Sequence, residues 1–73
     1  MTFKYNNELL TRRFLENNTI GQVKEFVKLK TNEANIKIFT PIPRKIYNDN
    51  KIKLKDSGLS KREMLNVELS NNN

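Results

Sequence analysis

The sequence contains no cysteine and no histidine among its 73 residues. Without cysteine, the chain has no disulfide to stabilise it and no thiolate for catalysis. Without histidine, it lacks the side chain that most often acts as a general base or as a metal ligand. The usual thiolate and imidazole chemistry is therefore excluded, and we expect neither a metal nor another cofactor.

Long apolar runs are also missing. No stretch approaches the roughly 20 residues of a transmembrane helix, and the N-terminus lacks the apolar segment of a signal peptide. We therefore expect no membrane partner, and a cytoplasmic or nuclear location for the chain or for a larger protein that contains it. The length predicts one small monomeric domain over residues 1–70, followed by a disordered asparagine tail at residues 71–73.

The sequence also lacks clusters of like charge. Fourteen basic residues against eight acidic ones give a net charge of +6. A basic surplus can attract nucleic acid, but here the signs are interleaved and no block of five like charges occurs. No RNA-binding aromatic signature or basic helix is present either. A solvated basic surface is favoured, and nucleic-acid binding stays as the alternative.

Carboxylates are the remaining groups that could support catalysis. The eight acidic residues are spread along the chain, and no pattern brings two of them to one pocket. We therefore expect no enzyme and no small-molecule substrate.

The first third of the chain predicts a hairpin followed by a helix. Residues 2–5 alternate apolar and polar side chains, residues 6–8 favour a turn, and residues 9–15 form a second extended run. Thr19 can cap a helix of about three turns, because Gln22 lies three residues on, as in a capping box. The helix shows apolar residues at helical spacing, and the hairpin supplies a sheet to cover them.

The rest of the chain predicts further strands at residues 36–39, 46–47 and 64–69, with Gly58 ending a short helical turn. The order of elements fits an α+β fold in which a mixed sheet of four to five strands packs on one helix. The expected core consists of Ile20, Val23, Val27, Ile36, Ile38, Leu54, Leu59, Leu65 and Val67.

Both prolines of the chain stand in residues 40–45, where they predict a stiff loop between two strands. The loop carries an apolar tip, Ile42, next to a permanent cation, Arg44. A rigid loop of this kind suits insertion into a partner's cleft, because it loses little entropy on binding. From these residues alone, a proline-capped hairpin with a solvated arginine is the favoured interpretation.

Two segments resemble ubiquitin. Residues 19–24, Thr-Ile-Gly-Gln-Val-Lys, resemble the start of the ubiquitin helix. Residues 54–59, Leu-Lys-Asp-Ser-Gly-Leu, with Met-Leu-Asn-Val at residues 64–67, resemble its closing segment. This resemblance implies the ubiquitin-like β-grasp fold. The chain ends in asparagines and not in Gly-Gly, so a conjugated modifier is rejected for this sequence.

Within that superfamily the chain resembles the UBX domain from Phe3 to Leu69. The specific element is Ile42-Pro43-Arg44 after the strand at residues 36–40, which resembles the Phe-Pro-Arg loop that follows the third strand of that family. The supporting segments are Arg-Arg-Phe-Leu at residues 12–15, Thr-Ile at 19–20, Glu-Phe-Val at 25–27, Ser-Gly-Leu at 57–59 and Leu-Asn-Val-Glu at 65–68.

The resemblance implies a function. UBX domains dock adaptors onto the N-terminal domain of valosin-containing protein, the hexameric AAA ATPase that extracts ubiquitylated clients for degradation. Their loop inserts between two subdomains of that partner, often with its proline in cis, and an arginine of the first strand assists. The family's binding residues correspond to Lys4, Ile42, Pro43 and Arg44 in this sequence. The expected partner-binding site also includes the flanking loop residues Thr40, Pro41 and Lys45.

Two of these positions depart from the family pattern. Ile42 replaces an aromatic residue and so fills less area. Lys4 replaces an arginine and cannot make planar, bidentate contacts. Both changes are expected to weaken docking or to indicate a divergent partner. Isoleucine before proline also makes the cis form less expected than an aromatic residue does. An apolar surface patch of the ubiquitin type is not expected, since Lys37, Asn66 and Glu68 take outward positions. Phe39 is the one large apolar residue predicted to face outward.

Overall fold

Five strands and two helices make up the computed structural model, which describes residues 1–60 and 62–69. The predicted asparagine tail at residues 71–73 and the last residue of the predicted domain, residue 70, lie outside the described residues. The elements in chain order are β1 (Thr2–Tyr5), β2 (Glu8–Thr11), α1 (Ile20–Thr31), β3 (Ile36–Pro41), β4 (Arg44–Ile46), α2 (Leu54–Ser57) and β5 (Met64–Leu69).

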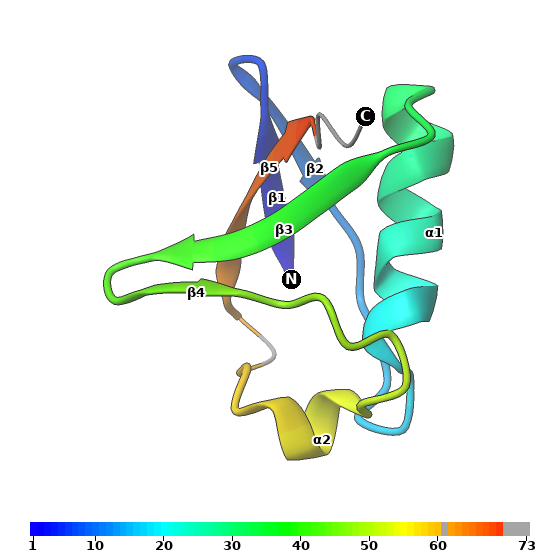
Figure 1. The fold of residues 1–73 in the computed structure, drawn as a ribbon, viewed down its shortest axis with the longest axis vertical. Helices are drawn as coiled ribbons and strands as arrows, with labels where there is room; N and C mark the ends of the chain where they lie inside the picture. Colours follow the sequence, from blue (N-terminus) through cyan, green and yellow to red (C-terminus); the bar gives the residue numbers. More distant parts are fainter. Residues whose placement is uncertain (61, 70–73) are drawn as a thin grey trace.

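The strands form one mixed sheet in the order β2-β1-β5-β3-β4. The central strands β1 and β5 run parallel, and the other neighbours are antiparallel. Helix α1 lies across one face of the sheet (Figure 1). The predicted α+β, ubiquitin-like β-grasp architecture is thereby confirmed.

The core lies between α1 and the inner face of the sheet. Eight of the nine predicted core residues are buried; the ninth, Leu59, is half-buried and packs against the cluster. Phe3 was missing from the prediction although its side chain is fully buried. It lies on β1 between β2 and β5, and its ring centroid lies 6.2 Å from Phe14 and 5.9 Å from Phe26. An aromatic cluster therefore extends the aliphatic core.

Helix α1 begins as predicted. The Thr19 hydroxyl accepts a hydrogen bond from the Gln22 backbone N–H at 3.2 Å, and Gln22 Oε1 accepts one from the Thr19 N–H at 2.8 Å. The next two backbone N–H groups of the helix bond to the loop before α2. Ile20 N–H donates to the Ile52 carbonyl, and Gly21 N–H donates to the Asn50 carbonyl. The loop comes so close that a Cβ on Gly21 would lie 3.0 Å from the Asn50 oxygen.

The second strand was predicted over residues 9–15 but ends at Thr11. Residues beyond it turn toward the helix, and the Arg12 guanidinium lies 4.9 Å from the Phe14 ring centroid and 5.2 Å from that of Phe26. Phe14 contacts the core from this segment. β1 begins at Thr2, which pairs with Thr11, so β2 ends where its partner strand does. The residues that follow instead place the Phe14 ring against the core and the Arg12 guanidinium near that ring.

The proline loop is shorter than predicted, because β3 extends through Pro41 and β4 begins at Arg44. Only Ile42 and Pro43 remain in the turn. The Tyr47 N–H donates to the Ile38 carbonyl at 3.0 Å, so by alternation Pro41 and Arg44 form a non-hydrogen-bonded pair. Pro41 therefore needs no N–H toward β4, which is why a proline is tolerated there. Tyr47, predicted as strand, lies just beyond β4.

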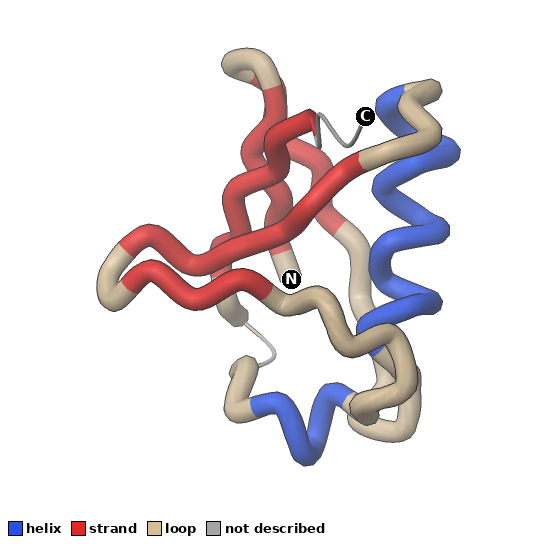
Figure 2. Tube along the Cα trace, in the orientation of Figure 1, coloured by secondary structure: helices blue, strands red, loops and turns tan. Residues whose placement is uncertain are grey.

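Strands β3 and β4 project as a hairpin away from the helix layer (Figure 2). Side chains alternate between the two faces of the sheet, so the register places Lys4, Asn66, Phe39 and Ile46 in one row. This row lies on the outer face, opposite α1. Helix α1 covers neither the outer face nor the projecting hairpin.

Candidate partner-binding hairpin

The tip of the β3–β4 hairpin is an exposed apolar side chain on a two-residue turn. Ile42 is 91% exposed, the highest value among the large apolar side chains of residues 1–60 and 62–69. The Ile42–Pro43 peptide bond is cis, the form that isoleucine made less expected. The Thr40 hydroxyl donates to the Pro43 carbonyl at 3.0 Å and ties the two sides of the turn together. The tip thus presents Ile42 to the solvent in a defined position.

Arg44 lies on the outer face of the hairpin, above the ring of Phe39. Its guanidinium carbon is 4.3 Å from the ring centroid, within the range of a cation–π contact. Its Nη2 donates to Glu68 Oε1 at 3.2 Å. Phe39 points outward as predicted but is only 8% exposed, and the guanidinium over its ring explains part of this burial. The arginine is held and not freely solvated.

Glu68 is shared by two cations. Its Oε1 lies 3.1 Å from Lys37 Nζ and 3.2 Å from Arg44 Nη2. The hydrogen bond from Lys37 is the main reason that the pKa of Glu68 lies below its ordinary value, and Arg44 adds to the lowering. The carboxylate therefore stays ionised at neutral pH. Two cations against one carboxylate leave this part of the outer face positive.

Lys45 lies on the opposite face of the hairpin from Arg44, because successive side chains alternate along a strand. Its Nζ is 5.1 Å from the Tyr47 ring centroid, and it pairs with Thr40 across the hairpin. The hairpin therefore carries one aromatic-supported cation on each face and an apolar residue at its end. Thr40 through Lys45 come together in this hairpin, as the sequence indicated.

Lys4 stands apart from the hairpin. It is exposed on β1 and shares the outer face with Arg44, but β5 and β3 separate it from β4. Three strand spacings of about 4.8 Å place the two strands roughly 14 Å apart. A partner would have to cover the outer face to reach both cations.

The outer face also carries apolar side chains that the sequence reasoning missed. Leu9 is 62% exposed, Met64 51% and Ile46 41%. Leu9 pairs with Lys4 and Ile46 with Phe39, while Met64 pairs with Thr2. The alternation within each strand was the available signal, but the register that joins the strands is needed to gather them on one face. Phe39 is therefore not the one large apolar residue on that face.

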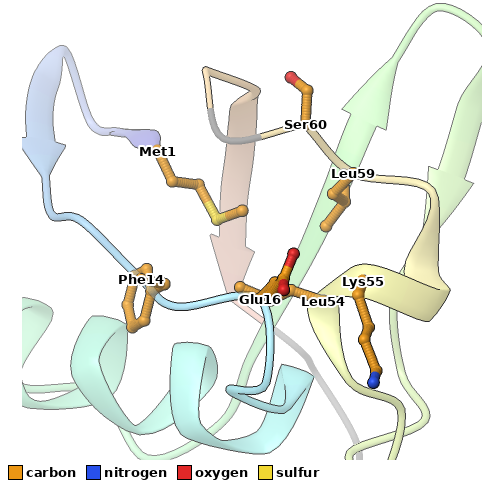
Figure 3. Close-up of a pocket in the computed structure, with 7 residues that line it drawn as sticks. All are labelled: Met1, Phe14, Glu16, Leu54, Lys55, Leu59 and Ser60. Atoms are coloured by element: carbon orange, nitrogen blue, oxygen red, sulfur yellow. The ribbon is translucent and has the colours of Figure 1, made fainter.

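A separate cavity of about 200 Å³ lies near α2, away from the hairpin. Figure 3 shows Met1 and Phe14 on one side of it and Leu59 with Ser60 on the other. Its ionisable side chains, Glu16 and Lys55, have opposite charges and offer no pair of carboxylates. The cavity is lined mainly by apolar atoms and shows no catalytic arrangement.

Across residues 1–60 and 62–69, no group of three or more carboxylates is placed to hold a metal ion. Neither helix within those ranges has the length and apolar character needed to cross a membrane.

Comparison with known proteins agrees with this geometry. The family model described as the UBX domain matches residues 5–69, which include α1, the β3–β4 hairpin and β5. Comparison with curated proteins and with solved structures returned no match. The matched range covers nearly the whole chain. The chain therefore belongs to the UBX domain family.

Proposed function

We propose that this domain docks an adaptor onto the N-domain of an AAA ATPase of the valosin-containing-protein type, in ubiquitin-dependent extraction or degradation. The UBX domain is a protein-interaction domain and not a catalytic one, and the family generally serves adaptors of this ATPase. The observation that carries the proposal is the projecting hairpin with Ile42 at its tip, 91% exposed, beside Arg44.

Ile42 is the proposed anchor. Its side chain is solvated in the free domain, so its transfer into an apolar cleft removes nearly all of its surface from water. The Thr40–Pro43 hydrogen bond keeps the turn ordered before binding, which lowers the entropy lost on docking. A single hairpin buries less than a standard interface, so we expect micromolar affinity, roughly −7 to −8 kcal/mol.

Arg44 is the proposed polar clamp, and Lys4 and Lys45 are auxiliary contacts. A guanidinium offers a planar fork that a lysine cannot reproduce. Arg44→Lys should therefore weaken binding although it keeps the charge. Ile42→Phe should strengthen binding if the partner's cleft accepts an aromatic residue, because the ring buries more area.

The test is a titration of the N-domain of the ATPase with the wild type, Ile42→Ala, Arg44→Ala and Ile42→Phe. Removal of either anchor should cost about 2 kcal/mol or more and make binding hard to detect. Circular dichroism checks that each variant stays folded, and Leu29→Ala on the exposed side of α1 serves as a matched control. If Ile42→Ala and Arg44→Ala both bind like the wild type, the hairpin only connects two strands and the proposed docking role is wrong.

Nucleic-acid binding is the alternative that the net charge of +6 keeps open. The two cations of the hairpin face opposite directions, which does not favour one continuous basic surface there. If net charge drives binding to DNA or RNA, the affinity should fall by orders of magnitude, roughly 10³-fold for six phosphate contacts, between 50 and 200 mM salt. Docking on the ATPase should persist at the higher salt concentration. Tight, salt-resistant RNA binding would reverse this ranking.

A further inference from the structure

Arg44 has two neighbours within the domain that hold its guanidinium from different directions. Its central carbon lies 4.3 Å from the centroid of the Phe39 ring, and its Nη2 donates to Glu68 Oε1 at 3.2 Å. Within residues 1–60 and 62–69, Glu68 is the one hydrogen-bond acceptor of this guanidinium. The other N–H groups are therefore left for a partner.

The two neighbours come from distant parts of the sequence. Phe39 belongs to β3 and Glu68 to β5, and the register brings both beside Arg44 on the outer face. Because an unsupported arginine side chain samples many rotamers, two contacts of this kind reduce the entropy that it loses on binding.

We propose that Phe39 and Glu68 are positioning residues for Arg44, holding its guanidinium so that its free N–H groups meet an oxygen acceptor beside the cleft that takes Ile42. This inference rests on the proposed docking function and extends it to residues outside the hairpin turn. Glu68 and Phe39 act through Arg44, and direct contact with the partner is not required of them.

The chain offers a matched control for each residue. Lys37→Gln removes the other cation bound by Glu68 and leaves its contact with Arg44 in place. Tyr47→Leu removes the ring beneath Lys45, on the opposite face of the hairpin. Each control alters a similar contact without touching the guanidinium of Arg44.

The test has one arm without the partner. In NMR spectra of the free domain, the side-chain protons of Arg44 should show an upfield ring-current shift and a restricted Nε–Hε group. Phe39→Leu should remove the shift, Glu68→Gln should increase the mobility, and the two controls should change neither. If Arg44 is equally mobile in the wild type and in both variants, the positioning role is wrong.

The second arm is the N-domain titration. Glu68→Gln should weaken binding about twofold to fivefold, as expected for an exposed ion pair. Phe39→Leu should weaken it by a similar factor, because the cation–π contact with the exposed Arg44 side chain is lost. The controls should bind like the wild type. In an Arg44→Ala background, with Ile42→Phe added to keep binding measurable, neither change should have a further effect.

The outcomes separate this inference from the proposed function. Loss of binding in Arg44→Ala together with wild-type binding by Glu68→Gln and Phe39→Leu overturns the positioning role and leaves the docking function standing. If Glu68→Gln and Phe39→Leu weaken binding equally with and without Arg44, the cause is general damage to the sheet. This result would also overturn the positioning role. Wild-type binding by both Ile42→Ala and Arg44→Ala overturns the docking function itself, and the positioning role with it.

Discussion

Ile38 and Ile42 belong to the same hairpin, yet Ile38 is fully buried and Ile42 is 91% exposed. Ile38 lies within β3 and belongs to the core cluster, whereas Ile42 lies in the turn between β3 and β4. This end of the hairpin points away from α1 (Figure 1). The difference separates two regions with different tasks. The inner face of the sheet supplies stability, while the projecting hairpin leaves Ile42 exposed and is the surface that we propose for docking.

The separation has a physical consequence. Substitutions in the covered region should lower the free energy of unfolding and affect binding only through loss of folded protein. Substitutions at the hairpin tip should weaken binding and leave the free energy of unfolding almost unchanged, because the replaced groups make few internal contacts.

The largest expected effect is that of Leu65→Ala. Leu65 is fully buried on β5, at the centre of the sheet, so truncation should lower the free energy of unfolding by about 2–5 kcal/mol. For a domain of this size that is much of the total stability. Urea denaturation measures it, with Leu9→Ala, an exposed leucine on β2, as the control. An unchanged midpoint would remove Leu65 from the core.

A smaller effect is expected at the start of α1. Gly21→Ala would place a Cβ 3.0 Å from the Asn50 carbonyl oxygen, which is backbone and must shift. The shift disturbs the hydrogen bond that Gly21 donates to that oxygen. We expect a loss of roughly 1–3 kcal/mol in the free energy of unfolding, although alanine is the better helix former. A gain in stability would show that the loop can move away at no cost.

The sequence predicted Leu65 as a core residue, but it did not predict the close contact at Gly21. The capping box and the apolar spacing of α1 are local, so they predicted the helix start and most of the core. The close approach of Asn50 to Gly21 depends on the path of a distant loop, which no local pattern specifies. For the same reason the fully buried Phe3 was missed, since its burial depends on Phe14 and Phe26.

In the hairpin, too, some features follow from local sequence and others depend on distant segments. Ile42, Pro43 and Arg44 could be selected from the proline spacing and the family resemblance. The extension of both strands to the turn could not, because it depends on which residue pairs exchange hydrogen bonds. The contact of Arg44 with Glu68 joins two residues that are 24 positions apart in the sequence. Only the register of the sheet brings them together.

The smallest expected effect concerns pH. The folded-state pKa of Glu68 is lowered, chiefly by the hydrogen bond from Lys37. Its contribution to stability is therefore present above the ordinary carboxyl pKa of 4.5 and is lost as the pH falls through the folded-state value. Comparison of Glu68→Gln with the wild type by thermal unfolding should show a difference at pH 7 that shrinks toward pH 3. A constant difference would show that the ion pairs do not contribute.

The most direct test of the central claim measures two quantities on one variant. For Ile42→Ala, we expect the free energy of unfolding to stay within about 0.5 kcal/mol of the wild type, while the affinity for the N-domain of the ATPase falls at least about 30-fold. That result would place binding in the hairpin and stability elsewhere. Wild-type affinity, or a loss of stability as large as the loss of binding, would contradict the account.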